Sequence, residues 1–443
     1  MTLTPTAQVS AAPQLKASAD WRRPSLMVAA ALLLVCVPSS ARLTPADLAA
    51  GIAVALVVLR WLADGTTLRG RGWLPFAAVV ASVAIAAVAA PDLSEGVVGF
   101  VRYTEVFVLI PVAVAMSLRD RVDARVVAGA FVATTVFEGA VGVWQRLTGT
   151  GASYAGEYVR AVGTFGAEQI MALGSLMGYG IVVTLALGLA ARGRARFLLL
   201  ATAAFLVLPL GFTLSRGAWI ATSCAVVVVL LVFSWRLGVA LLGTSLFAVV
   251  VLATGVGPAP SIVDERVASI AASGSAPDRS VRDRYALWGT AVDMWADHPV
   301  TGVGLKQFAR FRDTYAPMSL SAGSDVDDPQ AGFRRQPLLS AHNQYLMVLS
   351  EQGTIGILAF GALLGTLTAG AFRRTRSRAP GAARTDARWL DLAAPGLITW
   401  TLIDFVYGDI GAGPTGVTLG VMLGLVARRA VIVPRPIAPE AGR

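Results

Sequence analysis

Apolar runs of about 17–25 residues recur from one end of this chain to the other. Each run is long enough to cross a hydrocarbon layer about 30 Å thick. Of the 443 residues, 55% are hydrophobic and only 14% are charged, too few to give a soluble domain of this length a charged surface. The sequence therefore predicts an all-α polytopic membrane protein.

The runs predict about twelve transmembrane helices, so both termini fall on the same side of the membrane. We expect a cytoplasmic tail over 1–24, helices one to nine within 25–254, a large external loop over 255–342, helices ten to twelve within 343–427 and a cytoplasmic tail over 428–443. The predicted spans are 25–41, 46–62, 73–90, 97–117, 126–143, 170–191, 197–214, 217–233, 237–254, 344–370, 390–407 and 411–427.

Basic residues stand in short runs between the apolar segments and are not gathered on one domain. Under the positive-inside rule these links face the cytoplasm, which places the 255–342 loop outside. The formal net charge of +10 is thus spread over many links, and we expect no nucleic-acid partner. The runs are Trp21-Arg22-Arg23, Arg69-Gly70-Arg71, Arg119-Asp120-Arg121, Arg192-Gly193-Arg194-Ala195-Arg196 and Arg373-Arg374-Thr375-Arg376-Ser377-Arg378.

The large loop contains a segment with helical periodicity that ends before His298-Pro299. Asp283 is placed to cap its start, and Trp288, Val292 and Trp295 form one apolar stripe that we expect to pack against the membrane domain. Arg284 would then lie in the first turn, where the helix dipole disfavours a cation. We therefore expect Arg284 to have an anionic partner.

Two further side chains at the external face are candidates for chemistry. Arg216 lies between two apolar helices, where it can either extend to lipid headgroups or bind a phosphate, and Arg suits bidentate phosphate contacts. His342 is predicted to begin the tenth helix, with Tyr345 on the same face. Because histidine can take up a proton near neutral pH, His342 is a candidate base. The alternative is that it only forms a hydrogen bond at the start of the helix.

We do not expect the other polar features of the sequence to take part in chemistry. We interpret His298 as a turn residue and Gly302-Val303-Gly304 as a tight turn, and we expect the Gly/Ser/Asp-rich segment 319–332 to be mobile and without chemistry. Cys36 and Cys224 each sit inside an apolar run, so a disulfide is not expected. The sequence has no metal-ligand motif, and we expect neither a metal nor another cofactor.

Three motifs, by their order and spacing and together with the long external loop before the tenth predicted helix, resemble the O-antigen ligase and O-antigen polymerase superfamily of bacterial membrane glycosyltransferases. The resemblance implies a membrane-embedded, GT-C-like fold in the bacterial plasma (inner) membrane, with its active site facing outside. The motifs are Ser215-Arg216-Gly217-Ala218-Trp219, the segment Arg284 to Phe308, and the segment His342 to Gly356.

The resemblance also implies an activity in cell-wall or lipopolysaccharide biosynthesis. An undecaprenyl-diphosphate-linked glycan would be the donor, and a hydroxyl of a glycan, lipid or protein would be the acceptor, without metal or nucleotide sugar. Arg216 and Arg284 would bind the diphosphate, and His342 would deprotonate the acceptor. The further candidates to support this site are Asn343, Tyr345, Trp288 and Arg160.

Alternatives remain open at this point. Within the superfamily, the sequence favours a ligase slightly over a polymerase that joins repeat units. A polysaccharide or lipid transporter would instead use acids inside the membrane, for which Glu105, Glu138 and Asp404 are the candidates. A non-catalytic assembly protein is the third class.

Overall fold

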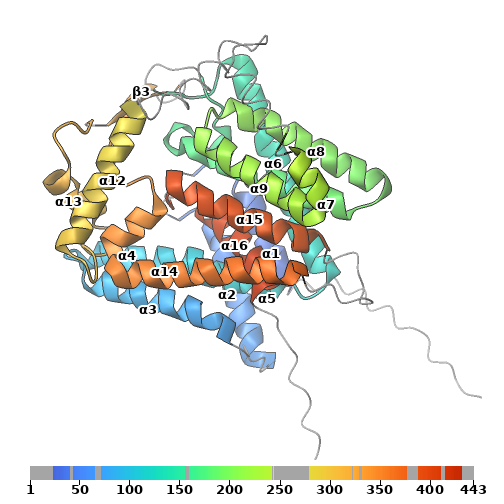
Figure 1. The fold of residues 1–443 in the computed structure, drawn as a ribbon, viewed down its shortest axis with the longest axis horizontal. Helices are drawn as coiled ribbons and strands as arrows, with labels where there is room; N and C mark the ends of the chain where they lie inside the picture. Colours follow the sequence, from blue (N-terminus) through green and yellow to red (C-terminus); the bar gives the residue numbers. More distant parts are fainter. Residues whose placement is uncertain are drawn as a thin grey trace, which may run out of the picture.

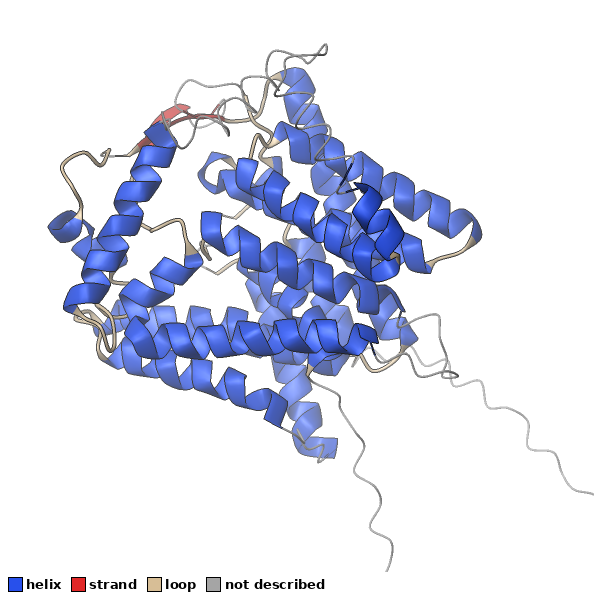
Figure 2. Ribbon diagram, viewed as in Figure 1, coloured by secondary structure: helices blue, strands red, loops and turns tan. Residues whose placement is uncertain are grey.

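The computed structural model describes residues 23–39, 43–64, 71–154, 159–241, 243, 279–321, 323–328, 332–376, 388–410 and 415–431. The described residues form a helical bundle with a few short strands at one end (Figures 1 and 2). The all-α class predicted from the apolar runs is confirmed.

The helices of the N-terminal half are α1 (Pro24–Leu34), α2 (Pro45–Asp64), α3 (Leu74–Val88), α4 (Leu93–Thr104), α5 (Ile110–Ser117), α6 (Arg121–Thr148), α7 (Ile170–Ala190), α8 (Gly193–Phe212) and α9 (Arg216–Phe233). A π-helical stretch, η2 (Glu105–Leu109), joins α4 to α5. Short 3₁₀ turns are η1 (Arg71–Trp73), η3 (Gly163–Phe165) and η4 (Ala167–Gln169). The later helices are α12 (Arg279–Asp297), α13 (Phe308–Tyr315), α14 (Gln344–Arg376), α15 (Arg388–Tyr407) and α16 (Thr415–Ala430).

Eight stretches of described helix are long and apolar enough to cross a membrane, and α1 and α3 are shorter apolar helices. The eight are Pro45–Ala63, Leu93–Ser117, Arg121–Thr148, Met171–Ala190, Gly193–Phe212, Arg216–Phe233, Gln344–Arg373 and Arg388–Tyr407. The predicted span 237–254 lies mostly outside the described residues. A multi-pass membrane protein is therefore supported, while the count of twelve and the topology stay predictions.

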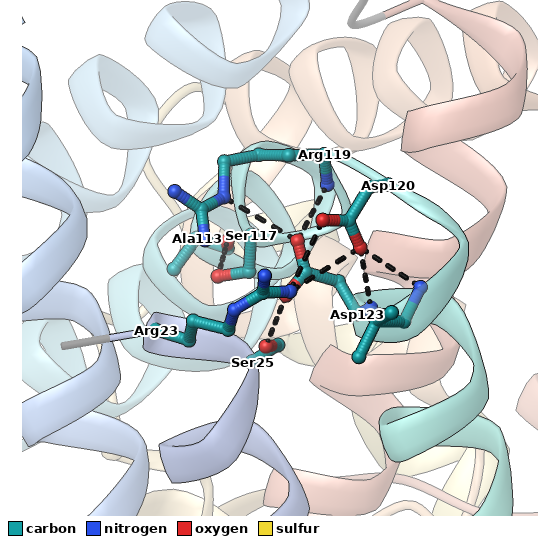
Figure 3. A network of polar contacts seen from close by, with 8 residues as sticks. Arg23, Ser25, Ala113, Ser117, Arg119, Asp120 and Asp123 are labelled. Carbon is teal, nitrogen blue, oxygen red and sulfur yellow. Dashed lines mark hydrogen bonds and ion pairs between the residues drawn. The ribbon is translucent and has the colours of Figure 1, made fainter. Parts of the chain in front are cut away.

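A polar network at one end of the bundle joins the start of α1 to the link between α5 and α6 (Figure 3). Buried Asp123 accepts hydrogen bonds from the Ser25 hydroxyl at 2.6 Å and from the Arg119 backbone N–H at 3.1 Å. Arg23 bridges Asp120 at 3.1 Å and Asp123 at 3.3 Å. Two links that were predicted to share the cytoplasmic side thus lie in direct contact.

The strands join the predicted external loop 255–342 to the segment between the fifth and sixth predicted spans. β1 (Ser153–Tyr154), β2 (Ser324–Asp328) and β3 (Gly332–Gln336) form an antiparallel sheet in the order β1-β2-β3. Ser153 pairs with Asp327, and Val326 pairs with Arg334. The segment 319–332, which was expected to be mobile, therefore contains strand β2, whose backbone pairs with β1 and β3.

Helix α12 differs from its prediction in two respects. It is already helical from Arg279, so Asp283 does not cap it, and the Asp283 carboxylate instead accepts the Ser321 N–H at 3.1 Å. Its buried stripe is Leu287, Ala291 and Met294, which pack with residues of the same loop such as Phe308. The prediction that Trp288, Val292 and Trp295 form the packing face is therefore wrong. The buried stripe consists of the residues one position earlier in the sequence.

The turn after α12 docks onto α14, and α12 crosses the ends of the bundle helices (Figure 1). The Val303 N–H donates to the Ser350 carbonyl at 2.9 Å, and Gly302 has a φ of 68°. A Cβ on Gly302 would lie 2.5 Å from the Ser350 oxygen, so only glycine fits there. The tight turn predicted at 302–304 is confirmed, and opposite it Gly353 breaks the helical geometry of α14.

Candidate active site

The backbone around His342 is held in an unusual conformation immediately before α14. His342 has a φ of 47°, in the left-handed region that favours glycine. Its N–H lies 3.4 Å from the Ser340 hydroxyl, and the Asn343 side chain accepts the Leu346 N–H at 3.1 Å and so caps α14. The cap fixes where the helix begins and leaves His342 outside its first turn.

Gln344 ties this segment to the loop that follows α15. Its backbone N–H donates to the Gly408 carbonyl at 2.9 Å, and its side-chain oxygen accepts the Ile410 N–H at 2.9 Å. Its amide nitrogen also donates to the Tyr103 hydroxyl at 3.2 Å. Because Gln344 is fully buried, these bonds hold residues 408–410 beside His342.

Charged groups of opposite sign act on His342 from two elements. Burial lowers the pKa of the His342 imidazole, the carboxylate of Asp409 opposes that change by raising it, and the guanidinium of Arg284 lowers it. Because the pKa lies below its ordinary value, the imidazole is neutral at neutral pH and can accept a proton. Two of the residues singled out in the sequence, Arg284 and His342, therefore act on one another.

Two carboxylates complete this cluster. Asp404, in the last turn of α15, interacts electrostatically with both Asp409 and Arg284. Asp409 has one buried carboxylate oxygen without a hydrogen-bond partner in the described part of the chain. From the sequence, Asp404 is a candidate only for a transporter, and Asp409 is not singled out. The one signal for Asp409 was an acid directly after the eleventh apolar run, on the predicted external side.

Arg216 lies at the same end of the bundle. It begins α9, and the Ser215 hydroxyl caps that helix by accepting the Ala218 N–H at 3.4 Å. Gly217 packs on the ring of Tyr407, where an added Cβ would lie 2.9 Å from the Tyr407 Cβ. Since Tyr407 is two residues before Asp409, the first turn of α9 lies beside the loop that contacts His342.

Arg160 belongs to a loop that is hydrogen-bonded to the end of α8. It exchanges backbone hydrogen bonds with Ala152 at 3.0 and 2.8 Å, and the next residue, Ala161, donates to the Phe212 carbonyl at 3.0 Å. Phe212 ends the helix that leads to Ser215 and Arg216. Arg160 therefore shares this end of the bundle with Arg216.

The remaining supporting candidates separate into two kinds. Trp288 is one turn after Arg284 on α12, its ring packs edge-on to Tyr285 with centroids 5.5 Å apart, and its buried indole N–H has no acceptor among the described residues. The Tyr345 hydroxyl donates to the Leu402 carbonyl at 2.8 Å, and its ring packs on Phe360 and Phe405. These contacts give Tyr345 a packing role.

Two of the three acids considered for a transporter have local partners. Glu105 pairs with Arg102 at 3.0 Å, and Arg102 also bonds Asp47 at 2.8 Å. Glu138 accepts the Thr164 N–H at 2.9 Å and the Thr164 hydroxyl at 2.6 Å. A local ion pair thus accounts for Glu105 and hydrogen bonds to a 3₁₀ turn account for Glu138, whereas Asp404 belongs to the cluster at His342.

His298, the other histidine of the loop, does not belong to the cluster at His342. His298 accepts the Gly302 N–H at 3.0 Å through its carbonyl, as a turn residue does. Within the described ranges, no group of three or more His, Cys, Asp or Glu side chains could hold a metal ion. The metal-independent chemistry expected above stays a prediction.

Part of the chain that includes this site matches a known protein family. Residues 201–361 match the family described as O-antigen ligase. The matched segment, shorter than half of the chain, contains Arg216, Arg284, Trp288 and His342 but neither Asp404 nor Asp409. No curated protein matches the chain. The predicted resemblance to the O-antigen ligase and polymerase superfamily is confirmed over this segment.

Proposed function

Starting from the O-antigen ligase pattern of residues 201–361, we propose that this protein is a membrane glycosyltransferase of the ligase type. It transfers a glycan from an undecaprenyl-diphosphate carrier to an acceptor hydroxyl on the outer face of the bacterial plasma membrane. The observation that carries the proposal is the cluster of Arg284, His342 and Asp409, in which a half-buried histidine interacts electrostatically with both a cation and an acid.

In the proposed step, His342 removes the proton of the acceptor hydroxyl. The hydroxyl oxygen attacks the anomeric carbon of the glycan, a new glycosidic bond forms and the bond from that carbon to the diphosphate oxygen breaks. The electron pair stays on the leaving undecaprenyl diphosphate, and attack from the opposite side inverts the anomeric centre. The proton remains on His342 until solvent takes it.

Two arginines stabilise the charge that develops on the leaving group. Arg284 interacts electrostatically with His342, and Arg216 begins a helix that packs on Tyr407 near the same loop. A guanidinium group presents several N–H donors in one plane and so can bind phosphate oxygens in pairs. Fixed positive charge in a site with little water stabilises a developing anion more than the same charge in bulk water.

Asp409 has a defined part in this mechanism. Its carboxylate favours the protonated imidazole, so it stabilises the cation that His342 becomes during the reaction. Arg284 has the opposite effect and keeps the resting imidazole neutral. Asp409 and Arg284 therefore act in opposite directions on the His342 pKa: Arg284 favours the neutral base before the reaction, and Asp409 favours the protonated form after it.

The test is transfer by purified protein from an undecaprenyl-diphosphate glycan to a candidate acceptor. The chain contains two histidines, which supplies a matched control. We expect His342→Ala to lower the rate by about 10²–10⁴-fold, the usual contribution of a positioned base, and His298→Ala to retain it. Equal rates for wild type and His342→Ala would remove His342 from the mechanism.

A deletion strain separates the ligase from the polymerase alternative. Long polymer stranded on the lipid carrier is the result expected for a ligase. Carrier loaded with single repeat units would instead assign the chain to the polymerases and refute the ligase proposal.

A further inference from the structure

Helix α12 has three faces, one more than an ordinary amphipathic helix on a protein surface. Its buried face is formed by Leu287, Ala291 and Met294, which pack inside the loop. Its polar face includes the exposed Arg282 and Asp293. The third face is apolar and partly exposed, and it consists of Tyr285, Trp288, Val292 and Trp295.

This third face has no apolar core beside it in the described structure. Tyr285 is 52% exposed and Val292 is 41% exposed, whereas Leu287 and Ala291 are fully buried. Exposed aromatic and aliphatic residues gathered in one stripe mark a surface that contacts a membrane or another protein.

The stripe continues directly into the exposed apolar surface of α14. The Trp295 indole donates to the Thr354 hydroxyl at 3.2 Å, and the Thr354 N–H donates to the Pro299 carbonyl at 2.8 Å. From that junction, α14 exposes Ile355 at 37% and Leu358 at 68%. Because α14 is one of the helices long and apolar enough to span the membrane, we expect lipid to cover Leu358, and the α12 stripe extends the same surface.

We propose that α12 lies in the outer membrane–water interface, with Tyr285, Trp288, Val292 and Trp295 against lipid and Arg282 and Asp293 toward water. The orientation of α12 across the ends of the bundle helices in Figure 1 is the one that a helix in the interface plane adopts. Trp and Tyr are enriched at this depth because their rings are apolar and carry one polar group.

The placement has a consequence for the site. Arg284 lies on α12 between the buried face and the lipid-facing stripe, one turn before Trp288. A helix in the interface holds such a side chain at the depth of lipid phosphate groups. If the proposed function holds, the diphosphate of the donor reaches Arg284 along α12 without leaving the headgroup layer.

The test measures depth and does not depend on transferase activity. In full-length protein with Cys36 and Cys224 replaced by alanine, single cysteines at Val292 or Asp293 carry a nitroxide, and the labelled protein is reconstituted in liposomes. We expect oxygen to relax the spin at Val292 more strongly than a water-soluble nickel chelate does, and the reverse at the neighbouring Asp293. Leu358→Cys gives the reference for lipid contact.

Tyr285→Cys and Arg282→Cys repeat the comparison about two and three turns earlier, in case a label at Val292 prevents folding. The proposal is overturned if labels at Val292 and Tyr285 are as accessible to the nickel chelate as labels at Asp293 and Arg282. That result would leave the stripe facing water, as a docking surface for a soluble partner. Loss of transfer in His342→Ala would still support the proposed function in that case.

Discussion

Gln344→Ala should separate the position of the candidate site from the stability of the bundle. The substitution removes a buried side chain that accepts the Ile410 N–H at 2.9 Å and donates to the Tyr103 hydroxyl at 3.2 Å. Leaving a buried polar group without a partner costs about 1–3 kcal/mol. With two such groups, we expect the free energy of unfolding to fall by about 2–4 kcal/mol. Part of this effect is local, because residues 408–410 lose a bond that holds them beside His342.

The loss of the Ile410 bond alone, about 1–1.5 kcal/mol, corresponds to about a tenfold lower population of the correctly placed loop. We therefore expect transfer per folded molecule to fall about tenfold, together with a lower melting temperature in detergent. The assay combines thermal unfolding with transfer measured well below both melting temperatures.

Asp123→Ala is the matched control at the other end of the bundle. Tyr103 and Arg119 are 16 residues apart on almost continuous helix, which is about 24 Å at 1.5 Å per residue. Asp123→Ala removes the bonds from Ser25 and Arg119 and should lower the melting temperature without changing transfer per folded molecule. Unchanged transfer by Gln344→Ala, or an equal loss in both variants, would refute the reasoning.

Two further substitutions test the arginine and glycine positions. Arg284→Lys keeps the charge but loses the planar pair of donors, so we expect kcat/KM for the lipid-linked donor to fall about tenfold or more, measured by transfer at limiting donor; retained kcat/KM would mean that a point charge is enough. Gly217→Ala places a Cβ 2.9 Å from the Tyr407 Cβ and should destabilise the bundle by about 1–3 kcal/mol in unfolding measurements. Gly129→Ala is its control, because an added Cβ there meets nothing within 4 Å; equal stability of the two variants would contradict the close packing of α9 on α15.

The fold could be predicted in outline because the membrane imposes a single solution on long apolar runs. A backbone in hydrocarbon must satisfy its hydrogen bonds within the segment, so the runs at 170–191 and 390–407 become α7 and α15 with nearly the predicted limits. The strand pairing of Ser153 with Asp327 could not be predicted, because the two residues are far apart in the chain and both segments are rich in turn formers.

Helix α12 shows why a periodic pattern can indicate the wrong face. The stripe Leu287, Ala291, Met294 and the stripe Trp288, Val292, Trp295 differ by one residue, and both are apolar at helical spacing. Only the tertiary structure decides which stripe is buried. The larger residues are the more exposed ones, as the interfacial position proposed for α12 would require.

The candidate site was predicted in part. Arg284 and His342 were singled out because a cation in a first turn and a histidine at a membrane interface are each unusual in such a sequence. The structure places Arg284 one turn deeper in its helix, where its charge still acts on His342. Asp409 could not be predicted to join them, because its contact with this segment depends on Gln344 bonding to Gly408 and Ile410 across a long sequence separation.

The most direct test of His342 as a base between opposite charges is the pH dependence of kcat/KM in three proteins. Transfer needs the neutral imidazole, so the rate should fall as the pH decreases through the His342 pKa and stay level above it. Asp409→Asn removes a group that raises this pKa, and should move the acid limb to lower pH. Arg284→Gln removes a group that lowers the pKa, and should move the limb to higher pH. Opposite shifts are the predicted result, whereas an acid limb at the same pH in all three proteins would contradict the account.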